Sequence, residues 1–488
     1  MQETKKQLQK SDVCLHDLSM MDPRGRLFLY DKKLYRAITK KYTPLYQRLF
    51  EEGIIAKLIE QEILIDTTIT DLKLSGYQLA LEHRTIPFIT YPHEWCDLMF
   101  KDATLLHIDL LIELNEYNLT ISDAGSLNIL FDGAKPIFVD FCSIVPVEEK
   151  PRWPGSTYDR FEYTFIHPLN IMSRNYGRLA RSFLQDTYYV STNQLRLELR
   201  AFNNGLDLKS RLSIWKNKVF QYFRKKTPSF IRPLVKKQFL FLQEKTVIKD
   251  KSFRSNLFSN LKSNIENITL PPAKVEYNKF YDNFFAPLEH SPKWTIKQEN
   301  IYQILQDYQP DSVLDIDCDR GWYALLAASC DIKVVAFDHH EACVKQLYMK
   351  AQQNNFYILP LVIDIASQTF DFSNEYFYTV YERLSCELVF ALNIFFTIFF
   401  ERHINLDKIL NRINNLSQKW VLIEYIYKDD LMKFILPEDS VTPDYWKVNH
   451  WYSLEEFVTI LETKYNLKVT TFSSYPETRK LLLCEKSV

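Results

Sequence analysis

Residues 311–338, with the sequence DSVLDIDCDRGWYALLAASCDIKVVAFD, constrain the fold of this chain more than any other segment. An apolar run at 312–316 predicts a strand that enters a tight loop. A run of small residues at 322–329 predicts a helix, and a second apolar run at 333–337 predicts another strand. Asp338 then follows about 20 positions after the loop, which is the layout that holds an adenine nucleotide against a parallel sheet.

The loop of this unit lacks most of the glycines that such a turn uses. Asp317 and Asp319 occupy it together with a single glycine, Gly321. The whole chain has only 9 glycines in 488 residues, which is far below average usage. The missing glycines therefore partly reflect a chain that uses little glycine anywhere, and the sequence predicts a nucleotide-binding turn with an acidic loop.

The length of the chain predicts two to four domains, and three regions can be distinguished. Residues 1–205 mix expected strands with a helix, residues 206–289 form a basic helical connector, and residues 290–488 alternate strand and helix as in a doubly wound sheet. In the first region we expect strands at 27–30, 86–89, 127–131 and 136–141, a helix at 96–116 and a hairpin turn at FDGAKP. In the third region we expect strands at 312–316, 333–337, 357–363, 387–392, 420–425 and 481–484.

Charge and composition restrict the partners and the compartment. Between Lys209 and Lys262 there are 15 Lys and Arg but only 2 Asp and Glu, so the connector can attract nucleic acid or an acidic surface, or can simply be a solvated helical face. The longest apolar run, 388–400, has 13 residues and is short for a bilayer. The eight cysteines have no zinc spacing and the N-terminus is polar, so we expect a cytoplasmic protein without a membrane span.

Three acidic residues lie at the ends of the first three strands expected in the third region: Asp315, Asp338 and Asp364. In a doubly wound sheet a ligand lies beyond the carboxyl ends of the strands. A carboxylate after the second strand can accept both ribose hydroxyls, and one after the third strand can accept the exocyclic amine of adenine. Carboxylates at three successive strand ends therefore predict an adenosyl-binding edge.

The segment at 313–329, VLDIDCDRGWYALLAAS, resembles the first motif of class I S-adenosylmethionine-dependent methyltransferases, VLDxGxxxGxxxxxLA. The segments PLVIDIAS, YERLSCELVFALNIFF and WVLIEYIYKDD are similar to one bacterial subfamily, in which such a domain follows a kinase-like region and whose members are sometimes labelled nodulation-type proteins. The order continues through ATLLHIDLLIEL, ISDAGSLNILFDGAKPIFVDF and YTFIHPLNIM, so the resemblance covers most of the chain. It implies transfer of a methyl group from the cofactor's sulfonium to an acceptor that the sequence does not identify.

The resemblance also implies roles for single residues at the cofactor. Asp315 and Gly321 would shape the loop beneath the methionine moiety, Asp338 would bind the ribose and Asp364 would face adenine. Asp317, also placed at the cofactor, replaces a glycine of the motif, and its charge would repel the methionine carboxylate. Arg320 can offset that charge by pairing with a carboxylate.

Methyl transfer to an oxygen or nitrogen usually also requires removal of a proton from the acceptor. The candidate bases are Glu424, Asp429 and His403. Many relatives carry two consecutive histidines after the fourth strand, where this chain has Phe396 and Thr397. Four further matches come from the resemblance: Glu382 and Arg383 form an acidic–basic pair, and Lys428 and Asp430 complete the acidic segment with Glu424 and Asp429.

A second constellation lies in residues 1–205. Asp123, Asn128 and Asp140, with a hairpin between the last two, resemble the catalytic loop and metal-binding aspartate of protein and small-molecule kinases. The resemblance implies that Asp123 orients the accepting hydroxyl, while Asn128 and Asp140 hold magnesium against the phosphates of ATP. Cys142 stands where the metal motif has glycine, and Arg36 is the residue closest to a phosphate-facing lysine.

Other kinase features are weak or absent. Ile121 and Ser122 replace the usual pair before the catalytic aspartate, and residues 22–26 are the nearest equivalent of a glycine-rich loop. The aromatic side chains Tyr91, Trp95 and Phe100 are expected in the core of this region.

Together these patterns predict an α+β kinase-like N-terminal domain, a helical connector and an α/β Rossmann-like C-terminal methyltransferase domain with a doubly wound sheet. The expected function is methyl transfer from S-adenosylmethionine, with Mg-ATP as a further ligand of the N-terminal site. Two alternatives remain open. One is a kinase-like phosphotransferase or nucleotide-binding protein whose methyltransferase domain is inactive, and the other is a methyltransferase that binds nucleic acid through the basic connector.

Overall fold

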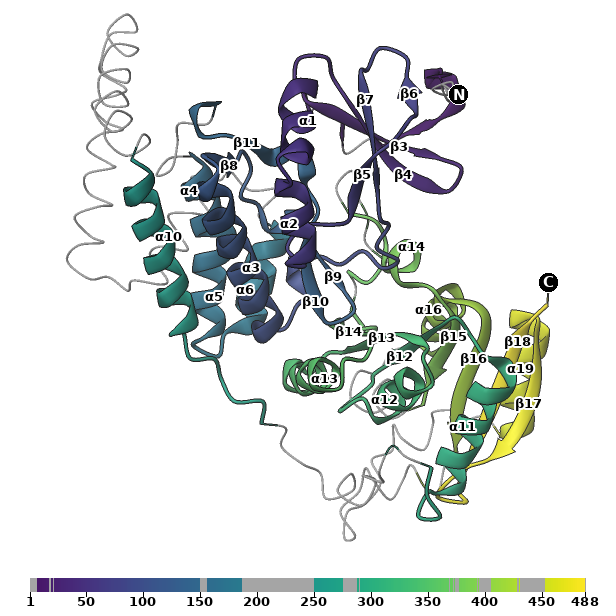
Figure 1. The fold of residues 1–488 in the computed structure, drawn as a ribbon. Coiled ribbons are helices and arrows are strands. Elements are labelled where there is room, and N and C mark those ends of the chain that lie inside the picture. Colours follow the sequence, from purple (N-terminus) through teal and green to yellow (C-terminus); the bar gives the residue numbers. More distant parts are fainter. Residues whose placement is uncertain are drawn as a thin grey trace, which may run out of the picture.

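The computed structural model describes residues 7–16, 19, 20, 22–149, 156–186, 250–274, 288, 290–367, 369–371, 373, 377–392, 394, 405–427, 430 and 453–487. Within these ranges an N-terminal domain and a C-terminal domain lie side by side (Figure 1). The borders predicted at 205/206 and 289/290 touch residues outside the described ranges and stay predictions.

The N-terminal domain begins with a five-stranded antiparallel sheet of order β2-β3-β4-β7-β5. Its strands are β2 (Cys14–Leu15), β3 (Gly25–Tyr30), β4 (Lys33–Ile38), β7 (Leu79–His83) and β5 (Thr67–Ile69). Between β4 and β5 the chain forms helices α1 (Thr43–Glu51) and α2 (Ile54–Glu60), and a small parallel pair joins β1 (Gln7–Leu8) to β6 (Lys73–Leu74).

Two of the predicted strands in this part of the chain have different outcomes. The strand expected at 27–30 is confirmed within β3, because its alternating pattern fits a sheet with one buried face. The strand expected at 86–89 is wrong: β7 ends at His83, and residues 84–89 belong to no strand. Pro87 lies in that run and has no amide hydrogen to donate to a ladder.

The rest of the N-terminal domain is built around helix α3 (Asp97–Glu116), which confirms the helix expected at 96–116. Its buried side chains recur every three or four residues and so form one broad face of the helix, and neighbouring elements pack against it. These neighbours are β8 (Leu119–Ile121) paired with β11 (Ile144–Pro146), the hairpin of β9 (Ile129–Asp132) and β10 (Lys135–Phe138), and helices α4 (Ser156–Phe161), α5 (His167–Met172) and α6 (Gly177–Asp186). The hairpin expected at FDGAKP is confirmed, with Gly133 in the left-handed conformation at φ 61°.

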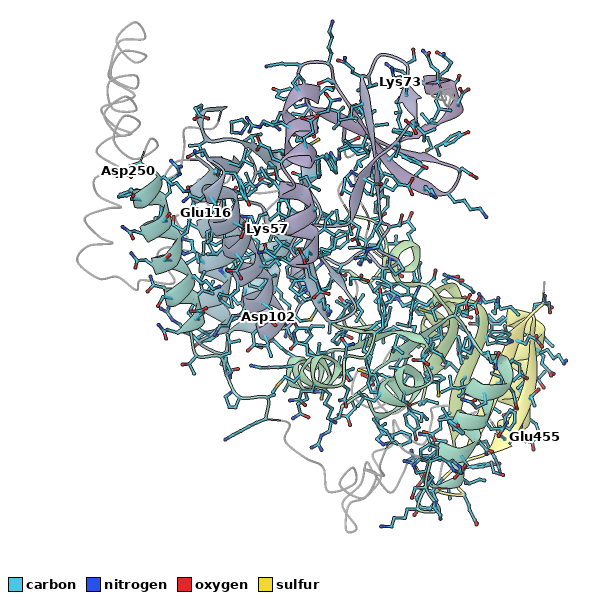
Figure 2. All side chains as sticks on the ribbon, viewed as in Figure 1. Lys57, Lys73, Asp102, Glu116, Asp250 and Glu455 are labelled. Carbon is cyan, nitrogen blue, oxygen red and sulfur yellow. The ribbon has the colours of Figure 1, made fainter. Side chains whose placement is uncertain are left out.

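Helix α10 (Lys251–Glu266), which was expected in the basic connector, packs along α3 (Figure 1). Lys251 pairs with Glu116 at 2.9 Å and Lys262 pairs with Asp109 at 2.6 Å. The end of α3 at Glu116 and the start of α10 next to Asp250 lie close together, whereas Asp102 lies toward the C-terminal domain (Figure 2). Part of the basic patch therefore contacts α3, and its residues 209–249 lie outside the described ranges.

The C-terminal domain contains a seven-stranded sheet of order β14-β13-β12-β15-β16-β18-β17, in which only β18 runs antiparallel to its neighbours. The strands are β12 (Ser312–Ile316), β13 (Lys333–Asp338), β14 (Ile358–Val362), β15 (Cys386–Ala391), β16 (Ser417–Ile426), β17 (Leu467–Ser473) and β18 (Arg479–Lys486). All six predicted strands are present. The sequence pattern missed β17, an edge strand in which most side chains are exposed or half-buried.

The helices of this domain fall into two groups, one before β14 in the sequence and one after it. Helix α11 (Ile296–Tyr308) contacts α12 (Trp322–Ser329), which precedes α13 (Glu341–Asn354). Helix α14 (Val380–Leu384) contacts α16 (Leu406–Leu416), and α19 (Leu454–Tyr465) packs beside β17. Small buried residues on α12, including Ala324 and Ala327, allow that helix to pack closely, and the arrangement is the expected Rossmann-like α/β fold.

The two domains are joined through α13, which lies between α3 and the C-terminal sheet (Figure 1). The ammonium of Lys345 on α13 lies 2.9 Å from Asp97 at the start of α3, and both side chains are buried. The hydroxyl of Tyr348 donates to Asp102 at 2.7 Å. Lys345 also donates to the carbonyl of Pro271, so the chain after α10 is tied to the same helix.

None of the helices in the described ranges is long and apolar enough to cross a membrane. The start of the apolar run at 388–400 forms the end of β15, and residues 395–400 lie outside those ranges.

The buried pair between the domains generates a prediction about stability. Replacing Lys345 with Met should destabilise the folded protein by about 3 kcal/mol, because removal of one partner leaves a buried carboxylate at Asp97 without its counterion. Urea denaturation followed by circular dichroism measures this change. The matched control is Lys419→Met, which breaks an ion pair with Glu387 whose lysine is half-exposed and should cost less than about 1 kcal/mol. Equal losses in the two variants would contradict the prediction.

Candidate functional site

The switch in strand order lies between β12 and β15, which are neighbours in the sheet although two strands separate them in sequence. In open α/β sheets a ligand binds beyond the carboxyl ends of the strands at such a switch. Asp315, near the end of β12, pairs in register with Ala336 on one side and Phe390 on the other. Its side chain is buried, and this burial raises its pKa to about 8. The carboxyl group is therefore largely neutral at pH 7.

The loop after β12 adopts backbone conformations that are typical of glycine, although Gly321 is its only glycine. Asp317 and Asp319 both have left-handed conformations, with φ 55° and φ 48°, and Gly321 has φ 73°. Asp and Asn are the side chains that tolerate this region best, at a cost of about 1 kcal/mol or more per residue. The acidic loop therefore has the sharp shape of a nucleotide-binding turn at the expense of local strain.

Asp338, the last residue of β13, holds this loop against the second strand. Its carboxylate accepts hydrogen bonds from the backbone N–H of Asp319 at 2.9 Å and of His340 at 2.7 Å. The ring Nδ1 of His340 lies 3.2 Å from the same carboxylate. A carboxylate has about four acceptor positions, so binding both ribose hydroxyls requires the imidazole of His340 to turn away. Two acceptor positions of Asp338 are therefore available only when the imidazole of His340 turns away.

The imidazole of His339 lies near two of these carboxylates. Its Nδ1 is 3.4 Å from Asp317 and 3.5 Å from Asp338. When protonated, His339 reduces the repulsion between the two aspartates. The fork that Arg320 was expected to form with a carboxylate stays a prediction.

Asp364 follows β14 and is half-buried, and its Oδ1 accepts a hydrogen bond from the backbone N–H of Ala366 at 2.8 Å. It lines a cavity of about 150 Å³ at the carboxyl end of β14. Residues of the N-terminal domain form part of the lining: Tyr91, His93, Glu94 and Gln185. The third strand-end carboxylate therefore faces a pocket that both domains build.

The candidate base Glu424 occupies a buried polar network on β16. Its side chain is fully buried, with oxygens 2.9 Å from Lys297 and 3.3 Å from Arg479, and it accepts a hydrogen bond from the hydroxyl of Ser474 at 3.0 Å. Arg479 also pairs with Asp430 at 3.0 Å. Because its oxygens are engaged and covered, this geometry favours a structural role, and a catalytic role for Glu424 stays a prediction.

Glu382 and Arg383, which were predicted as a pair, contact different partners, and several other predicted residues lie outside the described ranges. Glu382 accepts hydrogen bonds from Thr379 at the start of α14, which lowers its pKa, whereas the guanidinium of Arg383 bonds to Glu94 of the other domain. The remaining predicted residues are outside the described ranges: Phe396, Thr397, His403, Lys428 and Asp429.

The N-terminal constellation is assembled by the loop after β8 and by the β9–β10 hairpin. The side-chain amide of Asn128 donates to the carbonyl of Asp123 at 3.0 Å, and the Asp123 carboxylate pairs with Arg160 at 2.7 Å. Burial raises the pKa of Asp140 to about 6, and the guanidinium of Arg36 counteracts that rise. Sequence reasoning missed Arg160, because no spacing rule links it to residues 37 positions away.

Arg36, on β4, is buried and lies 3.5 Å from Asp22. Its charge also counteracts the raised pKa of Asp140, the predicted metal ligand. Among the predicted core aromatics, Trp95 and Phe100 are fully buried. Tyr91 is also buried, but it lines the interdomain cavity, which its sequence context did not indicate.

Comparisons with known proteins agree with the resemblance seen in the motifs. No family model matches the chain. The chain is 23% identical to the nodulation protein NoeA of Rhizobium meliloti (strain 1021) over 443 residues, which is 88% of each protein. The motif-based resemblance to nodulation-type proteins across most of the chain is thus confirmed.

Solved structures are similar to about two fifths of the chain. Magnesium protoporphyrin IX methyltransferase from Synechocystis PCC 6803 with bound SAH matches 39% of this chain and 81% of its own, at 14% identity and a TM-score of 0.28. The bifunctional kinase-methyltransferase WbdD matches 42% of this chain and 44% of its own, at 18% identity and a TM-score of 0.30. Similarities this low carry no argument about the function of the present chain.

The loop geometry predicts different effects of alanine at two glycines with the same backbone conformation. Gly321→Ala should destabilise the protein by about 2–4 kcal/mol, since a Cβ there would lie 2.5 Å from a methyl group of the buried Leu347 in addition to its unfavourable φ. Gly53→Ala, at φ 72° with no atom within 4 Å of the added Cβ, should cost only about 1–2 kcal/mol. Urea denaturation compares the two variants, and an equal cost would refute the close packing of the loop on α13.

Proposed function

We propose that this protein is an S-adenosylmethionine-dependent methyltransferase whose C-terminal domain binds the cofactor at the carboxyl edge of its sheet. The observation that carries the proposal is the position of Asp315, Asp338 and Asp364 at the ends of the adjacent strands β12, β13 and β14, beside the switch in strand order. The confirmed resemblance to nodulation-type proteins agrees with this proposal.

Each of the three carboxyl groups has a distinct role in this proposal. Asp338 accepts hydrogen bonds from the ribose hydroxyls once His340 has turned away, and Asp364 accepts a hydrogen bond from the exocyclic amine of adenine. Asp315, which burial keeps largely neutral, supports the loop beneath the methionine moiety without adding a full negative charge near its carboxylate. Asp317 and Gly321 complete the loop.

The cofactor supplies a methyl group that is already activated on sulfur. The chain therefore needs mainly to position the acceptor in line with that methyl group and to exclude water. Proton removal from the acceptor is assigned to Asp429 or Glu424 as a prediction, with Glu424 disfavoured by its burial. The acceptor itself and a cytoplasmic location also remain predictions.

Cofactor binding tests the proposal directly. Asp338→Ala should weaken binding of S-adenosylhomocysteine by about 1–3 kcal/mol in isothermal titration calorimetry, because a charge-assisted hydrogen bond to ribose is lost. Asp311→Ala is the control, since this exposed residue precedes the opposite end of β12. Asp338→Asn keeps the size of the side chain and an acceptor for one of the two backbone N–H groups, and the melting temperatures of both variants guard against a loss caused by misfolding. Indistinguishable affinities of the wild type and Asp338→Ala would remove Asp338 from the site.

A second candidate function is binding or turnover of Mg-ATP by a kinase-like N-terminal domain. The observation that favours it is the grouping of Asp123, Asn128 and Asp140 with the buried guanidinium of Arg36. In this arrangement Asn128 and Asp140 would hold magnesium, Arg36 would face a phosphate, and Asp123 would orient the accepting hydroxyl after release from Arg160.

Magnesium-dependent ATP turnover tests this candidate. Asp123→Asn and Asp140→Asn should each reduce turnover roughly a hundredfold or more, because the first removes the proton acceptor and the second removes a metal ligand. Asp66→Asn, an exposed residue paired with Arg84, is the control and should keep full turnover. Turnover that is absent in the wild type, or unchanged in both variants, would leave the N-terminal domain without a phosphotransferase role.

A further inference from the structure

The cavity of about 150 Å³ at the end of β14, here called the interdomain pocket, lies between the two domains. One wall follows β14 and includes Asp364, and the opposite wall is the segment 91–94 of the N-terminal domain. The C-terminal wall continues through Phe370, Phe377, Tyr378 and Arg383. A cavity of this size is large enough for a flat base.

The walls of the interdomain pocket combine aromatic rings with several polar side chains, among them His93, Gln185 and Asp364. The rings of Tyr91 and His93 are stacked with centroids 5.7 Å apart, and Phe377 meets both of them edge-on. Asp364 supplies a carboxylate that can accept a hydrogen bond from an exocyclic amine. Flat aromatic walls with a few placed polar groups are typical of sites for planar ligands.

His93 supplies one hydrogen-bonding group of the N-terminal wall, beside the amide of Gln185. Burial lowers its pKa, so the imidazole is neutral at pH 7 and has one donor and one acceptor nitrogen. In the described part of the chain neither ring nitrogen makes a hydrogen bond, although the residue is only partly exposed. A partly exposed imidazole that lines a pocket in this way can hydrogen-bond to a ligand or to water.

The segment 91–94 is fixed to the C-terminal domain by buried polar contacts. The guanidinium of Arg383 bonds to both oxygens of Glu94, at 2.5 and 3.0 Å, and donates to the carbonyl of Ile89 at 2.6 Å. The backbone N–H of Tyr378 donates to the hydroxyl of Tyr91 at 2.8 Å. The position of His93 relative to Asp364 is therefore set by the docking of the two domains.

We propose that the interdomain pocket receives the adenine ring of the methyl-donor cofactor, with Asp364 accepting from its exocyclic amine and His93 of the N-terminal domain hydrogen-bonding to a ring nitrogen. This inference rests on the proposed methyltransferase function. It adds a specificity-determining residue from outside the methyltransferase domain, so the cofactor site is complete only when both domains are present.

The same base is found in ATP, and the experiment must separate the two sources. The full-length wild type, His93→Phe and His93→Gln are titrated with S-adenosylhomocysteine and, separately, with Mg-ATP in a calorimeter. Phe keeps the ring packing against Tyr91 and Phe377 but removes both nitrogens, whereas Gln keeps a donor and an acceptor. Tyr357→Phe is the matched control, because it removes an interdomain hydrogen bond to Asp132 of 2.7 Å at a place outside the interdomain pocket.

The expected result is a roughly three- to tenfold loss of S-adenosylhomocysteine affinity in His93→Phe, from one lost hydrogen bond, with near-normal affinity in His93→Gln and Tyr357→Phe. Unchanged affinity in His93→Phe would overturn the inference and leave the proposed function standing. An equal loss in Tyr357→Phe would overturn it by tracing the effect to domain docking, and a loss confined to Mg-ATP would assign the pocket to the other nucleotide.

Absence of S-adenosylhomocysteine binding in the wild type would overturn the proposed function itself, and the inference with it. Melting temperatures of all four proteins show whether each variant is folded. Weak binding of S-adenosylhomocysteine by a folded His93→Phe protein then reflects a change in the interdomain pocket and not misfolding.

Discussion

Two buried ion pairs, Lys345 with Asp97 and Arg383 with Glu94, hold the N-terminal and C-terminal domains in one relative orientation. Buried pairs often add little net stability over apolar packing, since desolvation of the charges offsets their attraction. Their geometry is nevertheless demanding, because misalignment leaves charges buried without partners. The pairs therefore act mainly on orientation, and that orientation places segment 91–94 against the end of β14.

The edge of the C-terminal sheet concentrates acidic side chains in a small, poorly hydrated volume. The structure reduces their mutual repulsion in three ways. Burial keeps Asp315 largely neutral, backbone N–H groups bind Asp338, and the imidazole of His339 lies between Asp338 and Asp317. The bond from the Asp319 N–H to Asp338 also holds the glycine-poor loop, in which Asp317, Asp319 and Gly321 have left-handed conformations. An acidic loop and a usable pocket are thus compatible.

Sequence patterns predicted the C-terminal sheet well because its central strands are buried on both faces and read as short apolar runs between loops. Strands β12 to β14 and their terminal carboxylates follow directly from such runs. Edge strand β17 was not predicted, since its exposed positions carry polar residues. The prediction of a strand at 86–89 was wrong, because Pro87 has no amide hydrogen for a ladder. The roles of Glu424 and Tyr91 could not be predicted either. Ser474, which bonds to Glu424, and Tyr378, which bonds to Tyr91, lie at least 50 residues away in the sequence.

The sequence by itself determined the order of the strands along the chain, the carboxylates that end three of them and the glycine-poor loop, because these depend on local spacing and side-chain type. Only the tertiary structure decided which charges are paired and covered, as for Glu424 with Lys297, and which side chains meet across the domains. Burial and pairing depend on elements far apart in the chain, and so does the meeting of His93 with Asp364 at one pocket. No local pattern carries that information.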